Sequence, residues 1–315
     1  MSKFLPLLLL FLLSCGGGRT LHVVGILQWT EEIEAYRETY RGVLDGLEEG
    51  GFSEGKNLKI IYINAEQKRE RALKAVRTFL RQRADLIIAL GTGSALAAME
   101  KTRKVPIVYS IVGDPEATGI KGPNVTGTSM KVPVKDQLKE ALKFVPQVKR
   151  MGVLYCPKMP QAVATAKEAM EAARTLGLQA EEIAVPEEEL SALEMRLSGK
   201  LPHLDLVYIP TDPILHRPEL FEKVLSICSS YQVPVVGVSE DVVKRGALLA
   251  YHCSFYEIGR QAAAQAVLIL SGMEVKKIPP EGPHIRLLSL NLTTARILGL
   301  HIPRRLIQRA DNLYQ

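Results

Sequence analysis

The stretch ADLIIALGTGSALAAMEKTRKVPIVYSIVGDPEATG, residues 84–119, decides the fold of this chain. Two short apolar runs within it, 86–90 and 107–111, are rich in branched residues and are typical of buried strands. Residues 95–102 between them have a helical composition. A strand, a helix and a second strand at this spacing predict a βαβ unit, which requires a parallel sheet.

Small and polar residues follow each of these strands, as GTGS at 91–94 and GDP at 113–115. In open parallel sheets, ligands bind at the carboxyl ends of the strands. Ser94 is placed to cap the helix, whose first N–H groups would face an anion. Thr92, Gly93 and Ser94 are therefore candidate ligands of a carboxylate, although an ordinary strand-to-helix turn would have the same composition.

Length and charge set the broad class of the protein. A chain of 315 residues predicts two domains, and 23% charged residues is ordinary for a globular protein. The formal charge is +6, but basic and acidic residues are interspersed and no basic stripe carries aromatic residues. We therefore expect a mixed solvated surface and no nucleic-acid partner.

The first residues have the pattern of an export signal rather than of a folded element. Lys3 precedes an apolar run at 4–13, which is too short to span a bilayer, and small residues follow it. The sequence LSCG at 13–16 is similar to a bacterial lipobox, which predicts that Cys15 is lipidated and becomes the mature N-terminus. An ordinary secretory signal with an incidental cysteine is the alternative. Residues 16–18, all glycine, would begin a flexible tether.

The remaining cysteines, Cys156, Cys228 and Cys253, cannot all pair and have no zinc-site spacing. We expect buried thiols, no metal site and no cofactor.

The second half of the chain repeats the first in outline. DLVY at 205–208 matches DLII at 85–88, and VPVV at 233–236 matches VPIV at 105–108. Thr211 and Asp212 follow one of these strands, and Asp241 follows the other. The fold class is therefore α/β, with two Rossmann-like lobes. Two such lobes can face each other across a cleft with their polar strand ends, although two βαβ units can also be similar by chance.

We place the domain boundaries from the turn-rich segment at 124–128 and from the order of the later elements. Residues 1–18 are the signal and tether. Residues 19–128, with about 250–282, form the N-terminal lobe. Residues 129–249, with about 283–315, form the C-terminal lobe.

Taken together, these motifs resemble the solute-binding lipoproteins of bacterial ABC transporters, in the group that contains tryptophan- and tyrosine-transport binding proteins. The resemblance covers nearly all of the mature chain and depends on these segments: GVLDGLEEGG at 42–51, 85–91, 114–115, NVTGTS at 124–129, 152–155, YEIGRQAAAQAVLILSG at 256–272 and NLTTARILGL at 291–300. It implies a type I periplasmic-binding fold with two lobes joined by three crossings. Members often carry an acidic-His-Pro turn after the first strand, whereas this chain has Gln28-Trp29-Thr30-Glu31, which leaves the ligand open.

The resemblance implies a monomer, lipid-anchored to the membrane and facing the periplasm or cell exterior, that delivers a solute to an ABC permease. An exported transferase is an alternative, but the sequence has no nucleophile elbow, phosphate loop or metal cluster. A ligand-sensing receptor for a membrane kinase is a second alternative.

An amino-acid ligand would need partners for its carboxylate, its ammonium and its side chain. Thr92 and Ser94 suit the carboxylate, and Asp114 or Asp212 suits the ammonium. Trp29, the only tryptophan, would form an aromatic wall or pack inside one lobe. The other expected ligand-binding residues are Gly93, Thr128, Thr211 and Asp241.

Overall fold

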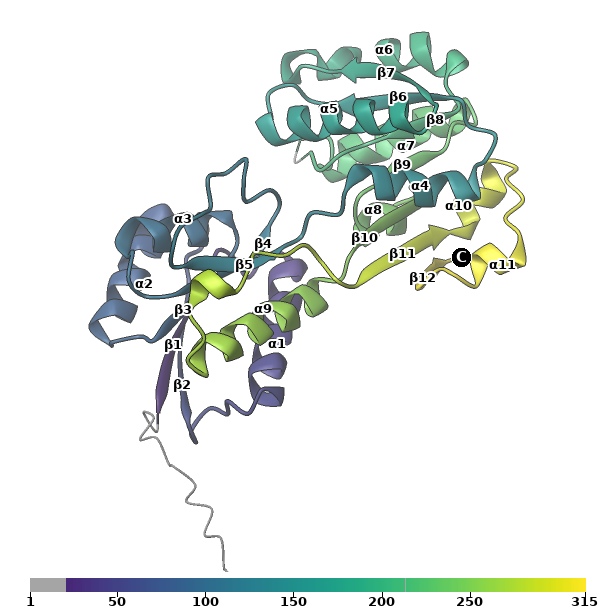
Figure 1. Cartoon of the computed structure of the whole chain (residues 1–315). Helices are drawn as coiled ribbons and strands as arrows, with labels where there is room; N and C mark the ends of the chain where they lie inside the picture. Colours follow the sequence, from purple (N-terminus) through teal and green to yellow (C-terminus); the bar gives the residue numbers. More distant parts are fainter. Residues whose placement is uncertain (1–20, 213) are drawn as a thin grey trace, which may run out of the picture.

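The chain forms two α/β lobes, each built around its own sheet (Figure 1). The structure is a computed structural model and describes residues 21–212 and 214–315. The predicted Cys15 site lies outside the described residues.

The first lobe contains a five-stranded parallel sheet in the order β2-β1-β3-β4-β5. Its strands are β1 (His22–Gln28), β2 (Leu58–Asn64), β3 (Leu86–Leu90), β4 (Ile107–Val112) and β5 (Val125–Ser129). Central strands are buried on both faces, which is why they read as unbroken apolar runs.

Two pairs of helices cover this sheet. Helices α1 (Glu34–Glu49) and α9 (Phe255–Leu270) pack on the face that carries Val24 and Ile26. Helices α2 (Arg69–Arg81) and α3 (Thr92–Lys101) cover the opposite face, where Leu27 is buried. Alternate residues of one strand point to opposite faces, so β1 supplies side chains to both cores.

The second lobe contains a seven-stranded sheet in the order β12-β11-β10-β9-β8-β6-β7. Only β10 and β11 pair antiparallel. The strands are β6 (Arg150–Tyr155), β7 (Gln179–Ala184), β8 (Leu206–Tyr208), β9 (Val235–Gly237), β10 (Leu249–Cys253), β11 (Arg286–Asn291) and β12 (Asn312–Tyr314).

Helices α4 and α5 pack on one face of this sheet, and α6 and α7 on the other. The helices of the lobe are α4 (Val134–Phe144), α5 (Pro160–Thr175), α6 (Leu193–Lys200), α7 (Pro218–Ser230), α8 (Glu240–Lys244), α10 (Leu292–Ile297) and α11 (Arg304–Ile307). The short 3₁₀ helices η1 (Glu187–Ala192) and η2 (Leu201–His203) belong to this lobe, whereas η3 (Val275–Lys277) follows α9 and contacts β5 of the first lobe.

Three segments cross between the lobes, at 130–133, at Ser254 and at 279–285. The first and third lie side by side, because the Ser129 N–H donates to the Glu281 carbonyl at 2.9 Å and the Glu281 N–H donates to the Gly127 carbonyl at 3.0 Å. Strand β10 pairs in the second sheet, so the second crossing begins at Ser254.

Helix α3 begins earlier than its composition indicates. Gly91, with φ of +98°, is the N-cap, so the helix starts at Thr92 directly after the strand. Glycine accepts this backbone conformation without steric cost. Ser94 therefore lies inside the first turn with a fully buried side chain, and the prediction that it caps the helix is wrong.

Helices α1 and α9 approach closely because glycines face the contact. A Cβ atom on Gly42 would lie 2.0 Å from the Tyr256 carbonyl oxygen, and one on Gly259 would lie 2.2 Å from the Thr39 carbonyl oxygen. The Thr39 hydroxyl donates to the Phe255 carbonyl at 2.9 Å. Backbone atoms cannot move aside as a flexible side chain can, so a methyl group here must separate the helices.

We expect Gly42→Ala to lower the free energy of unfolding by about 1–3 kcal/mol, as overpacking of a well-packed contact does. Gly199→Ala is the matched control, because Gly199 is helical and has no atom within 4 Å of the added methyl. The control should be neutral or stabilising by up to about 1 kcal/mol, since alanine favours helix. Urea unfolding followed by circular dichroism measures both, and equal midpoints would contradict the steric argument.

Candidate functional site

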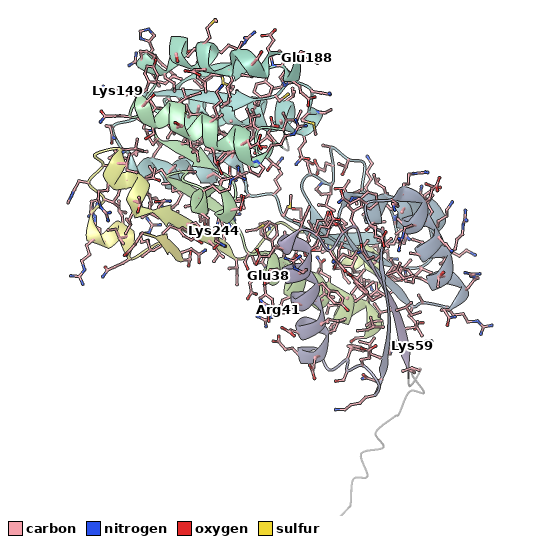
Figure 2. The ribbon with its side chains drawn as sticks, turned by 180° about the vertical axis from the view of Figure 1, so that it is seen from behind. Glu38, Arg41, Lys59, Lys149, Glu188 and Lys244 are labelled. Carbon is pink, nitrogen blue, oxygen red and sulfur yellow. The ribbon has the colours of Figure 1, made fainter. Side chains whose placement is uncertain are left out.

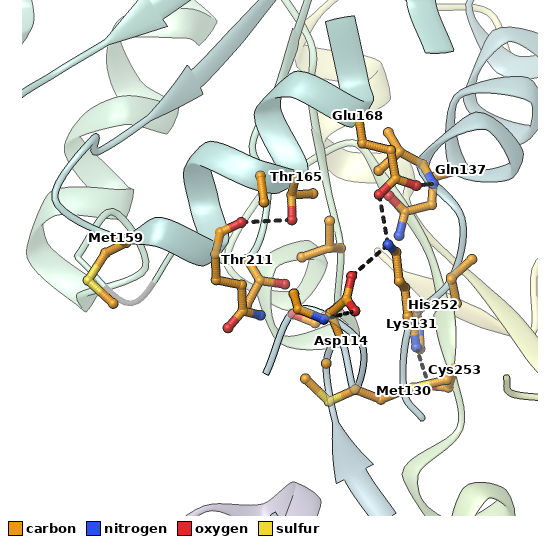
Figure 3. Close-up of a pocket in the computed structure, with 18 of the residues that line it drawn as sticks. Asp114, Met130, Lys131, Gln137, Met159, Thr165, Glu168, Thr211, His252 and Cys253 are labelled. Atoms are coloured by element: carbon orange, nitrogen blue, oxygen red, sulfur yellow. Dashed lines mark hydrogen bonds and ion pairs between the residues drawn. The ribbon is translucent and has the colours of Figure 1, made fainter. Parts of the chain in front are cut away.

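A cavity of about 730 Å³ opens between the lobes, at the carboxyl ends of the strands of both sheets (Figure 3). Cavities of this size bind small molecules. The first lobe contributes Thr92, Gly113, Asp114, Ala117 and Thr118, together with Phe255 at the start of α9. The crossings and the second lobe contribute Met130, Lys131, Val132, Val134, Gln137, Met159, Pro160, Gln161, Ala164, Thr165, Glu168, Tyr208, Thr211, His216, Val238, Ser239, His252 and Cys253.

A chain of charged groups crosses this cleft. The Lys131 ammonium donates to Asp114 Oδ2 at 2.9 Å and lies 3.1 Å from Glu168 Oε2. Asp114 belongs to the first lobe, Glu168 to helix α5 of the second, and Lys131 to the crossing between them (Figure 3). One ammonium group is therefore shared by carboxylates from opposite lobes.

The local contacts shift the pKa values of two of these groups. The Ala117 N–H donates to Asp114 Oδ1 at 2.9 Å, and this bond, with the Lys131 ammonium, holds the pKa of Asp114 below its ordinary value. Partial burial lowers the pKa of Lys131, but the hydrogen bonds to Asp114 and Glu168 outweigh it and the net pKa is raised. Asp114 and Lys131 are thus both charged near neutral pH.

Helix α5 brings its first turns to the cleft. Pro160 occupies the first helical position, where its fixed φ fits and no N–H is required. A Cβ atom on Gly113 would lie 2.9 Å from Gln161 Nε2, so the strand end of the first lobe nearly contacts this helix. The two lobes therefore meet at the N-terminus of α5.

Asp212 organises the loop after β8 and does not line the cleft. Its carboxylate is fully buried and accepts the N–H groups of Cys156 at 2.6 Å, Ile214 at 2.9 Å and Leu215 at 3.1 Å. The prediction that Asp212 contacts a ligand ammonium is therefore corrected, because backbone donors already occupy both of its oxygens. Its neighbour Thr211 lines the cleft as expected.

Trp29 and Gly93 pack together behind the cleft. A Cβ atom on Gly93 would lie 2.4–2.6 Å from carbons of the Trp29 ring, and the ring packs against the core beneath α2 and α3. Neither residue lines the cavity in this structure. The Ser94 hydroxyl is buried and has no hydrogen-bond partner among the described residues.

Two predicted site residues lie away from the cavity. Thr128 is fully buried in β5, where its hydroxyl contacts Gln265 Oε1 at 3.5 Å. Asp241 lies in the first turn of α8, is mostly exposed and pairs with Arg245. Of the nine residues predicted from the sequence, the structure thus brings together Thr92, Asp114 and Thr211.

Several polar residues of the cleft were not predicted from the sequence, above all Lys131, Gln137, Thr165, Glu168, His216 and His252. Lys131 could have been found, because it follows the segment predicted to cross between lobes. The helical residues carry no such local signal, since their position depends on how the second lobe faces the first.

The two histidines of the cleft are held neutral. Burial lowers the pKa of His216 to about 4. Burial also lowers the pKa of His252, whose ring nitrogens contact the Cys253 carbonyl at 2.9 Å and Ser289 Oγ at 2.8 Å. Within residues 21–212 and 214–315, no group of three or more His, Cys, Asp or Glu is arranged to hold a metal ion.

The backbone is strained where the first lobe meets the crossings. Ile111, a branched residue, has φ of +53°, and the register between β4 and β5 shifts at this point. Its side chain is buried with Val132, Cys253 and Ile258, which come from the first and second crossings or beside them. Strained positions of this kind persist only where the surrounding packing fixes them.

None of the helices in the described part of the chain has both the length and the apolar character that a membrane span requires.

Comparisons with known proteins place this fold. The family model described as ABC transporter substrate binding protein matches residues 23–314. A tyrosine-binding protein of Clostridioides difficile (strain R20291) is 26% identical over 262 residues, which are 81% of this chain and 74% of that protein.

Two solved structures are similar over nearly the whole chain. The ligand-free, open form of a substrate binding protein with adhesive properties from Clostridium difficile has a TM-score of 0.86 at 26% identity, covering 94% of this chain and 99% of that one. An ABC domain from Streptococcus pneumonia in complex with L-Trp has a TM-score of 0.72 at 22% identity, covering 93% and 99%, a likeness that shows the fold alone.

These findings confirm the predicted fold, two α/β lobes of the type I periplasmic-binding class, and the predicted family. They give no support to the alternatives of a transferase or a kinase-coupled receptor. The chain belongs to the ABC transporter substrate binding protein family, whose members are extracytoplasmic, non-enzymatic proteins that capture a small solute for a permease.

Proposed function

We propose that the cleft binds one free amino acid between the two lobes. The relatives support this class of ligand, since one is a tyrosine-binding protein and another structure holds L-Trp. The observation that carries the proposal is the single ammonium group held between Asp114 and Glu168. A site that already stabilises one ammonium between carboxylates of opposite lobes can accept another in its place.

Asp114 is the proposed partner of the ligand ammonium, with Glu168 as its counterpart from the second lobe. Both carboxylates are about one-third exposed, so a solute can reach them. Their present partner, Lys131, sits on a crossing whose path changes when the lobes move. A ligand that displaces Lys131 would therefore contact both lobes at once.

The first turn of α3 is the proposed seat of the ligand carboxylate. Thr92 lines the cleft, and the free N–H groups of a helix start attract anions. Gly93 and Ser94 contribute their backbone groups. Thr211, on the opposite lobe, offers a hydroxyl to the same ligand.

Apolar residues of the cleft suit the ligand side chain. Met130, Met159 and Phe255 line the cavity, and Tyr208 donates its hydroxyl to Gln137 Oε1 at 2.6 Å, which leaves its ring as an apolar wall. Trp29 lies behind this surface and supports Gly93. This set favours an apolar or aromatic side chain.

Capture proceeds by hinge closure in our proposal. The moving bodies are residues 21–129 with 254–282, and 130–253 with 283–315, which rotate about the three crossings. The ligand must bind the closed form better than the open one, or it shifts no equilibrium. We propose that a single copy then presents the closed form to the permease.

The same proposal includes a lipid anchor at Cys15, which would hold the protein at the outer face of the cell membrane. It rests on the lipobox-like sequence at 13–16.

A thermal-shift screen of amino acids should identify the ligand, because a ligand at one hundred times its dissociation constant stabilises the fold by about 2.7 kcal/mol. Asp114→Asn should weaken binding at least 30-fold, since loss of one partner of an enclosed charge pair costs about 2–5 kcal/mol. Asp241→Asn is the matched control and should bind like the parent.

Scattering should show compaction at saturating ligand. Unchanged binding by Asp114→Asn would refute the ammonium assignment. A shift with non-amino-acid solutes alone would refute the ligand class while leaving the solute-binding function.

Stability at low pH should depend on Asp114. Because the pKa of Asp114 is lower in the folded protein than its ordinary value of 3.8, its contribution is present above that value and is lost as the pH falls through the folded pKa. Asp114→Asn should therefore be less stable than the parent at pH 7 but lose less stability on acidification. The check is urea unfolding of both proteins at pH 7 and at a pH below the folded pKa of Asp114. Equal losses of stability on acidification in the parent and in Asp114→Asn would contradict the pKa argument.

Cys15→Ser should release the protein from the membrane fraction, because acyl chains supply the attachment and stable anchoring needs more than one chain. Fractionation of cells, with a high-salt wash of the membranes, measures this. Retention of the variant after that wash would refute the anchor.

A further inference from the structure

The amino-terminal edge of the first sheet is a separate surface, one strand length away from the cleft. Strands β2 to β5 are preceded by loops at 53–57, 82–85, 102–106 and 119–124. The sheet is parallel and its strands are in near register, so all these loops gather at the edge where β1 begins. The cleft lies at the opposite, carboxyl edge.

This edge carries an excess of exposed positive charge. We define the amino-edge cluster as the basic residues of these loops together with the second residue of β2: Lys56, Lys59, Arg83, Arg103, Lys104 and Lys121. All six are exposed. In Figure 2, Lys59 lies at the end of the first lobe that is remote from the second.

The amino-edge cluster is not neutralised by neighbouring acids. No ion pair between described residues involves any of the six, and Lys59 contacts only the amide oxygen of Gln82, at 3.4 Å. Cations on the neighbouring helices differ, since Arg69 pairs with Glu100 and Arg71 with Glu66. The acidic residues of these four loops are Glu54 and Asp85, and Asp85 accepts the Val23 N–H at 2.8 Å.

The chain preceding the fold enters at this same edge. Six residues, 16–21, connect Cys15 to the start of the first lobe, and a chain of that length reaches at most about 21 Å. The anchor at Cys15, which this argument takes from the proposed function, therefore keeps the amino edge near the lipid headgroups. The carboxyl edge, with the cleft, lies about 20 Å further along the strands.

We propose that the amino-edge cluster rests on the anionic phospholipid headgroups of the membrane that holds the protein. Each Lys or Arg close to an anionic surface strengthens partitioning by about fivefold, within a Debye length of about 10 Å. Held in this way, the first lobe stands on its amino edge, and the cleft opens away from the bilayer toward free solute. An acidic face of the permease is the competing occupant.

Vesicle flotation tests this surface without the anchor. The protein is residues 19–315, which include every strand and helix that the structure describes. The vesicles are phosphatidylcholine alone or phosphatidylcholine with about one-third phosphatidylglycerol, at about 0.05 M salt and again at about 0.5 M. We expect binding only to the anionic vesicles, and only at the lower salt concentration.

Two variants with equal changes in net charge locate the contact. The test variant carries Lys56→Glu, Arg83→Glu, Arg103→Glu and Lys121→Glu, and should lose more than 100-fold in partitioning. The control carries Lys139→Glu, Lys167→Glu, Arg304→Glu and Arg305→Glu on exposed positions of the second lobe, and should keep most of the binding. Thermal melts verify that both variants fold. If the four glutamates prevent folding, a variant with glutamine at the same four positions replaces the test variant.

Equal losses in the two variants would overturn the proposal, because net charge alone would then explain binding. Equal binding to neutral and to anionic vesicles would also overturn the proposal. Binding that appears only when the vesicles contain the permease would do the same. The tested protein, residues 19–315, lacks Cys15, so the result of the flotation experiment does not depend on the anchor. Failure of the anchor and failure of the basic surface are therefore distinguished.

Discussion

The contact between α1 and α9 is the constraint on which the rest of the architecture depends. Helix α9 follows strands of the second sheet in sequence, yet its alanine face is buried against the first sheet together with Val43 and Leu47. Of the first lobe's own long helices, α1 packs on that face and leaves room beside it for α9, because α2 and α3 occupy the other face. The chain must therefore leave the second lobe at Ser254 and return at 279–285. Two of the three crossings exist because of this one packing requirement.

Three crossings determine what the cleft can do. They fix the axis about which the lobes can turn, and they place a charged residue, Lys131, between them. An exposed ion pair contributes little to stability by itself. The importance of this ion pair lies in its position, since the Lys131 ammonium occupies both Asp114 and Glu168. The strained Ile111 lies next to these crossings, and its side chain packs with Val132 and Cys253.

The sequence predicts the elements better than it predicts the site. Periodicity and apolar runs depend on neighbours along the chain, so the strands predicted at 86–90 and 107–111 are found at Leu86–Leu90 and Ile107–Val112. The start of α3 could not, because a single glycine conformation at 91 decided it. Asp114 and Asp212 have the same sequence context, an Asp-Pro after a strand, but only Asp114 lines the cleft. The difference arises from the Cys156, Ile214 and Leu215 N–H groups, which converge on Asp212 only in the folded lobe. Glu168 depends on contacts between lobes, which no local pattern encodes.

A parallel sheet has two chemically different edges, and this protein uses that difference. At the carboxyl edge, helix starts and strand ends present N–H groups and short polar side chains, which suit a small zwitterion. At the amino edge, helices end and strands begin, so carbonyl groups favour cations nearby, and the exposed charged residues of the loops here are mostly basic. The direction of the chain thus separates the solute site from the surface next to the N-terminal segment. Because both edges belong to one rigid sheet, the orientation of the amino edge also sets the direction in which the cleft opens.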